Sequence, residues 1–114
     1  MIADFYLFCK KVLKKLGVRA PHLLALGLHK LRAFKSDDYS FAGEFKELNE
    51  LTHKLGLETG FAVDIAANDG LNQSSTYGFF KKNWAGLAVE MDPLMFSKLS
   101  YLYADFEKVR LART

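Results

Sequence analysis

The sequence predicts an α/β fold in which a parallel sheet, begun as strand–helix–strand–helix–strand, follows an amino-terminal helical region. Residues 61–67 form a short apolar run interrupted only by Asp64, which suits a parallel strand covered on both faces and is too short for a core helix. A second apolar stretch, residues 86–91, follows after an interval that accommodates a crossover helix. These two runs and their spacing predict the fold class.

Composition and charge narrow the class of protein. The chain has 114 residues, of which 50% are hydrophobic and 25% charged, as expected for one soluble domain or part of one. Cys9 is the single cysteine, so the sequence has no disulfide framework and no cysteine metal site, which fits a reducing, cytoplasmic location. The net charge of +3 comes largely from a local lysine cluster, so we expect no nucleic-acid partner. No apolar run approaches the ~20 residues that span a bilayer.

The lysine cluster belongs to the first predicted helix, from Asp4 to Leu16, which Gly17 ends. One face of this helix is apolar, and the opposite face carries Lys10, Lys11, Lys14 and Lys15. Such a helix either packs on its own domain or makes weak contact with an anionic membrane surface. Packing is the commoner outcome, and membrane contact stays an alternative.

Two further helices are predicted before the sheet. Pro21 suits the first turn of a helix through about Phe34, and helical periodicity then resumes from Phe41 until Gly56 stops it. His53, near the end of the latter, is expected to face solvent. The expected buried positions are Leu23, Leu24, Leu28, Leu31 and Phe34 in the former and Phe41, Phe45, Leu48, Leu51 and Leu55 in the latter. Residues 1–57 therefore form a helical region, and residues 58–114 begin the sheet domain.

From residue 60 the pattern changes to alternating strands and helices. The strand at 61–67 leads to a crossover helix over about 74–83, and the strand at 86–91 leads to a helix that Asp92-Pro93 opens. A third strand begins near Val109. The carboxyl ends of parallel strands share one edge of a sheet, where ligands of open α/β sheets bind. We therefore expect Asn68, Asp69 and Gly70 to lie beside Glu90.

The residue types at this edge indicate the ligand. Small residues after the first strand let the backbone approach a ligand, and the carboxylate of Glu90 can accept both hydroxyl protons of a ribose. A dinucleotide site needs several glycines to seat its pyrophosphate, whereas the run from Ala66 has Gly70 alone, and Asp69 would repel phosphate. A nucleoside with positive charge, attracted by Asp64 and Asp69, fits better. S-adenosyl-L-methionine is such a ligand.

Between residues 60 and 99 the sequence resembles the FkbM-type S-adenosylmethionine-dependent methyltransferases, class I enzymes with a Rossmann-like fold. The blocks that carry the resemblance are, in order, Val63–Gly70, Ser74–Tyr77, Asn83–Glu90 and Asp92-Pro93. The resemblance implies that Asp64 holds the methionine end of the cofactor, that Glu90 binds the ribose, and that Met91 lies near the adenine. It further implies a cofactor loop made by Ala66, Ala67, Asn68, Asp69 and Gly70. The implied acceptor is an oxygen of a small molecule or sugar; catalytic residues are not assigned.

The sequence departs from the family at two places. Ala66 stands where members usually have glycine, and a positive φ at that position would cost an alanine about 1 kcal/mol. Class I methyltransferases also have more strands than the three predicted here. We therefore expect the amino-terminal part of a methyltransferase, a partial Rossmann-like sheet with one pocket wall open and a hydrophobic edge facing water. The alternatives are part of an NAD-dependent oxidoreductase and a non-catalytic module for membrane association or interaction.

Overall fold

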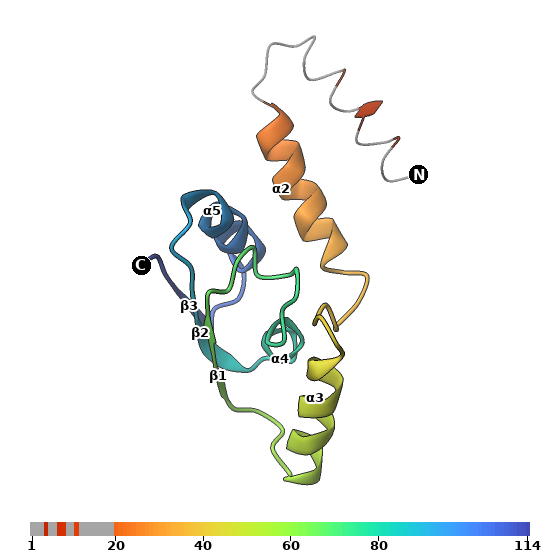
Figure 1. Ribbon diagram of the computed structural model, residues 1–114, viewed down its shortest axis with the longest axis vertical. Helices are drawn as coiled ribbons and strands as arrows, with labels where there is room; N and C mark the ends of the chain where they lie inside the picture. Colours follow the sequence, from red (N-terminus) through yellow and green to blue (C-terminus); the bar gives the residue numbers. More distant parts are fainter. Residues whose placement is uncertain (1–3, 5–6, 9–10, 12–19) are drawn as a thin grey trace.

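The computed structural model describes residues 4, 7–8, 11 and 20–114 (Figure 1). Their order along the chain is α2 (Ala20–Arg32), α3 (Glu44–Lys54), β1 (Phe61–Ile65), α4 (Tyr77–Lys81), β2 (Ala85–Val89), α5 (Pro93–Leu102) and β3 (Val109–Ala112). The strands form a parallel sheet in the order β1-β2-β3. The predicted α/β fold is confirmed, and the arrangement is consistent with part of a Rossmann-like sheet. The helix predicted from Asp4 to Leu16 lies largely outside the described residues, as does Cys9.

The strands lie where the sequence predicts them, but β1 and β2 each end two residues earlier than predicted. β1 ends at Ile65 rather than residue 67 because Ala66 turns the chain with a φ of 60°. The amide of Ala67 still donates to the carbonyl oxygen of Val89 at 2.8 Å, so the first turn of the following loop stays attached to β2. The crossover helix α4 has only five residues, because it starts after a turn at 74–76 and Asn83, with a φ of 75°, ends it.

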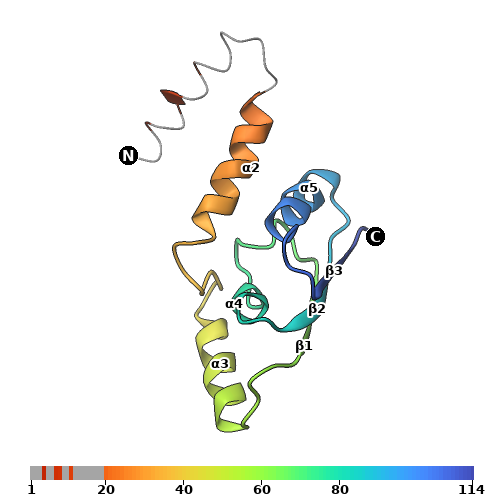
Figure 2. The same ribbon diagram turned by 180° about the vertical axis from the view of Figure 1, so that it is seen from behind.

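The helices cover one face of the sheet. Because the strand order follows the sequence, right-handed crossovers place α4 and α5 on the same side. In Figure 1 the helices α2, α3 and α4 lie to the right of the strands, and Figure 2 shows the same arrangement from behind. Gly86 lets the Phe80 ring pack directly on the sheet, since a Cβ there would lie 2.3 Å from that ring.

The expectation that the first strand is covered on both faces is wrong for the described residues. On β1, Phe61, Val63 and Ile65 are 66%, 52% and 70% exposed, and all three point to the face opposite the helices. The core is formed from the other face, where Ala62 of β1, Ala88 of β2 and Val109 of β3 meet the helices. Among the described residues, β1 therefore presents an apolar face to solvent, which the sequence did not predict.

The predicted inward face of α2 is wrong in part, because only Leu24 and Leu28 of its five members are half-buried. Leu23, Leu31 and Phe34 are exposed, whereas Leu26 and Ala33 are buried. The leucines of this segment surround the helix, so periodicity alone does not fix which side packs. The side chosen is the one that contacts α5 and the loop after β1.

The helix α3 begins three residues later than predicted and ends before Gly56, whose φ of 72° stops it as expected. Only Phe45 of the predicted apolar stripe is buried; the other four members, Phe41, Leu48, Leu51 and Leu55, are exposed. His53 is exposed, as predicted. Within the part of the chain that the structure describes, no helix is both long enough and apolar enough to cross a bilayer.

Candidate functional site at the carboxyl ends of β1 and β2

The loop after β1 reverses direction through alternating backbone conformations. Ala66, Asn68 and Gly70 have φ values of 60°, 57° and 83°, in the left-handed region. Asparagine and glycine visit this region readily, whereas alanine does not. Gly70 is also required by packing, because a Cβ there would lie 2.8 Å from side-chain carbons of Leu99 and Leu102. The position of Ala66 thus has the conformation for which glycine is suited.

Glu90 joins this loop to the one that follows β2. Its Oε1 accepts a hydrogen bond from the amide of Asn68 at 2.8 Å, and its Oε2 accepts one from the amide of Asp92 at 2.8 Å. The residue is buried, with 8% exposure. The predicted proximity of Glu90 to the loop after the first strand is confirmed. Each carboxylate oxygen has two lone pairs, so each retains acceptor capacity for a hydroxyl group.

Asp64 lies on the helix-covered face of β1 and is half-buried. Its Oδ2 accepts a hydrogen bond from the hydroxyl of Thr76 at 2.6 Å. The sequence predicts that Ser74, Ser75 and Thr76 cap the crossover helix. Ser74 does so, because its Oγ accepts from the amide of Tyr77 at 3.0 Å, but the Thr76 hydroxyl turns to Asp64 instead. Thr76 is therefore a site residue that sequence reasoning missed.

Asp69 directs its carboxylate into its own loop. Its Oδ1 accepts from the amides of Leu71 and Asn72 at 3.0 and 2.8 Å, and its Oδ2 accepts from the side-chain amide of Asn72. With 3% exposure, it shapes the loop from within.

The remaining residues predicted to bind the cofactor differ in how exposed they are. Ala66, Asn68 and Met91 are exposed, Met91 by 75%, whereas Ala67 is 5% exposed and packs in the core. Met91 directly follows Glu90 and borders the same edge. The structure thus brings the loop after β1, Asp64, Glu90 and Met91 to one end of the sheet.

Tyr103, which directly follows α5, makes a hydrogen bond to the loop after β1. Its hydroxyl donates to the carbonyl oxygen of Gly70 at 3.2 Å. Burial raises the pKa of this phenol, and the negative charge of Asp64 adds to the effect. Tyr103 therefore stays protonated and serves as a fixed donor. Sequence reasoning missed it because its partner is distant in the chain.

This edge of the sheet combines the exposed residue Asn68, the carboxylate oxygens of Glu90 and the carboxylate of Asp64. In the described ranges, no group of three or more histidine, cysteine or acidic side chains is placed to hold a metal ion. The groups that this edge offers are carboxylate acceptors at Glu90 and Asp64. Comparison of the chain with family models, with curated proteins and with solved structures found no match.

Proposed function

We propose that the chain binds S-adenosyl-L-methionine at the carboxyl ends of β1 and β2, as the cofactor-binding part of a methyltransferase. The observation that carries the proposal is the carboxylate of Glu90, which accepts from the amides of Asn68 and Asp92 and retains further acceptor capacity. A carboxylate at the end of the second strand of an open α/β sheet is suited to the two ribose hydroxyls.

The other residues have complementary roles in this proposal. Asp64, held by Thr76, supplies negative charge toward the ammonium and sulfonium groups. The exposed thioether of Met91 provides an adaptable surface for the adenine. The bound cofactor supplies an electrophilic methyl group, and the chain contributes by orienting it toward an acceptor oxygen of a small molecule or sugar.

The form of the first crossover favours this ligand over NAD. A dinucleotide fold leads from its first strand directly into a helix whose amino terminus receives the pyrophosphate. Here residues 66–76 separate β1 from α4, and α4 has only five residues. The loop also contains a single glycine, Gly70. These features support a ligand without a pyrophosphate.

The test combines calorimetry with amide NMR on the wild-type chain. We expect S-adenosylmethionine to bind and to shift the amide signals of Asn68 and Asp92, while Lys108, near the opposite end of the sheet, is unchanged. We expect NAD to produce neither effect. Binding of NAD alone, or binding of S-adenosylmethionine without shifts at Asn68 and Asp92, would overturn the proposal.

A substitution checks the role of Glu90 directly. We expect Glu90→Ala to weaken S-adenosylmethionine binding at least tenfold, because it removes a charged hydrogen-bond acceptor, worth about 1.5–3 kcal/mol. The exposed Glu50→Ala on α3 is the control and should bind as the wild type does. Circular dichroism establishes that both variants are folded. Equal affinity of folded Glu90→Ala and wild type would contradict the assigned role.

A non-catalytic interaction module in a cytoplasmic setting is the second candidate. The exposed apolar stripe of α3 and the amino-terminal lysine cluster favour it. Co-sedimentation with anionic liposomes, with and without residues 1–17, tests membrane association. Loss of sedimentation on deletion would support this candidate. Unchanged sedimentation would show that the lysine cluster does not cause membrane association.

A further inference from the structure

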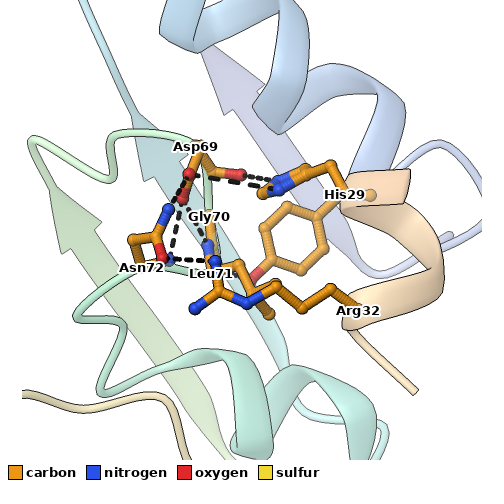
Figure 3. A network of polar contacts seen from close by, with 7 residues as sticks. His29, Arg32, Asp69, Gly70, Leu71 and Asn72 are labelled. Carbon is orange, nitrogen blue, oxygen red and sulfur yellow. Dashed lines mark hydrogen bonds and ion pairs between the residues drawn. The ribbon is translucent and has the colours of Figure 1, made fainter. Parts of the chain in front are cut away.

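The helix α2 contacts the loop after β1 through two polar side chains. Each side chain lies 40 residues before its partner in the sequence. The Nε2 atom of His29 lies 2.7 Å from the carbonyl oxygen of Asp69. Three residues further along the same helix face, Nη1 of Arg32 donates to Oδ1 of Asn72 at 2.7 Å. Figure 3 shows both side chains reaching from α2 to the loop. The helix thus holds the loop at two points.

The His29 contact is buried and specific. The side chains of His29 and Asp69 are only 8% and 5% exposed, and Nδ1 of His29 lies 4.0 Å from Oδ2 of Asp69. A carbonyl oxygen only accepts hydrogen bonds, so Nε2 of His29 carries a proton and donates it. The hydrogen bond fixes the peptide unit that leads from Asp69 into Gly70.

That peptide unit closely follows two residues with left-handed backbone conformations. Ala66 and Asn68 occupy the left-handed region without being glycine, and such conformations persist only where their surroundings hold them. The carboxylate of Asp69 accepts from the amides of Leu71 and Asn72, and the Tyr103 hydroxyl donates to the carbonyl group of Gly70. His29 supplies the hydrogen bond to the carbonyl group of Asp69 itself. The loop that places the Asn68 amide against Glu90 is therefore in direct contact with α2.

We propose that His29 is a positioning residue of the ligand site, which acts through Asp69 to hold the loop at Asn68 in its binding conformation. The consequence for ligand affinity rests on the proposed function, whereas the effect on the loop does not. The helical region before the sheet is thereby part of the site. Arg32 supports the same loop at its far end.

The first experiment measures the loop without any ligand. We expect His29→Ala to raise amide exchange at Asn68, Gly70 and Leu71 at least tenfold while Ala88 in β2 is unchanged. His29→Gln, whose side-chain amide can donate in place of the ring, should restore much of the protection. The control is His53→Ala, since His53 also lies in the last turn of a helix but is exposed. Unchanged loop protection in His29→Ala, or an equal loss at Ala88, would overturn the proposal.

A measurement on the wild type guards against a variant that fails to fold. A hydrogen-bonded imidazole proton exchanges slowly enough to give an NMR signal, so we expect a resolved Nε2–H signal from His29 with a nuclear Overhauser contact to Gly70. A His29 ring protonated at Nδ1 alone, or one without this signal at low temperature, would contradict the proposal.

Calorimetry then links the loop to the ligand. We expect His29→Ala to weaken S-adenosylmethionine binding five- to tenfold, His29→Gln to recover most of it, and His53→Ala to match the wild type. A wild type that does not bind would overturn the proposed function and leave the exchange result intact. A His29→Ala variant that binds as well as the wild type, with loop protection lost, would overturn the positioning role alone.

Discussion

Ala66 adopts a left-handed conformation, with a φ of 60°, at an exposed position where β1 ends. A side chain with a Cβ is strained in this region, and glycine is not. We predict that Ala66→Gly raises the free energy of unfolding by about 0.5–1 kcal/mol, the relief of strain exceeding the entropy that glycine adds to the unfolded chain.

Urea denaturation measures the change at Ala66. Ala104→Gly is the matched control, because Ala104 is exposed in a turn but is absent from the residues with positive φ. That substitution should destabilise the protein. A loss of stability at both positions would show that the conformation of Ala66 carries no appreciable strain.

Tyr103 predicts how stability depends on alkaline pH. Because burial raises its folded pKa, the unfolded phenol, which ionises near pH 10, releases its proton first. The stability that the neutral, buried phenol contributes is complete below about pH 10. It is lost as pH rises toward the folded pKa, at up to ~1.4 kcal/mol per pH unit. Tyr103→Phe should therefore show a shallower alkaline loss, and a cost of about 1 kcal/mol at pH 7 from the missing hydrogen bond to Gly70.

Chemical denaturation between pH 7 and pH 11 tests this prediction. Burial also raises the pKa of Tyr77, so part of the alkaline slope should persist in Tyr103→Phe. Tyr101→Phe is the control, because Tyr101 is 39% exposed whereas Tyr103 is 3% exposed, and it should retain the full slope. Identical slopes for Tyr103→Phe and wild type would show that the phenol of Tyr103 does not couple to folding.

At the scale of elements, the start of α5 is fixed by one side chain. Oδ1 of Asp92 accepts from the amides of Leu94 and Met95 at 2.9 and 3.0 Å, and Pro93 occupies the first helical position. We predict that Asp92→Ala lowers the free energy of unfolding by about 1 kcal/mol and that Asp92→Asn retains most of the stability. Thermal and urea unfolding measure both variants, with the exposed Glu107→Ala as reference. Equal stability of all three variants would contradict the cap.

At the scale of the whole molecule, the bare sheet face predicts self-association. Phe61 and Ile65 present large apolar side chains on β1, which is an edge strand of the sheet that the described residues form. We predict that the double substitution Phe61→Thr with Ile65→Thr reduces association at high concentration, because threonine keeps the β-propensity and lowers the apolar area. Each exposed substitution should change stability by no more than about 0.5 kcal/mol.

Sedimentation velocity over a range of concentrations measures this association. The control is Leu48→Gln with Leu51→Gln on α3, which removes exposed apolar side chains from a different surface. Reduced association in the sheet variant alone locates the contact on β1. An equal reduction in both variants, or none in the sheet variant, would contradict the prediction.

Local signals carried most of the correct predictions. The apolar run around Val63, the Asp92-Pro93 start and the Gly56 stop each act within a few residues, so they are readable from the chain. The meeting of Asn68 with Glu90 was also predictable, because parallel strands bring their carboxyl ends to one edge. These features follow from backbone geometry and from spacing.

The tertiary structure alone decided which surfaces are buried and what supports the loop. The leucines of α2 allow several packed faces; in the folded chain α2 contacts α5, and Leu26 is the buried leucine of the helix. The contacts of His29 with Asp69 and of Thr76 with Asp64 join positions whose separation has no periodic signature. The sequence by itself determined the strands, their order of connection and the candidate edge, because those depend on local propensity and chain connectivity. The orientation of the helices, and with it their support of the loop after β1, depends on the free energy of packing across the whole fold.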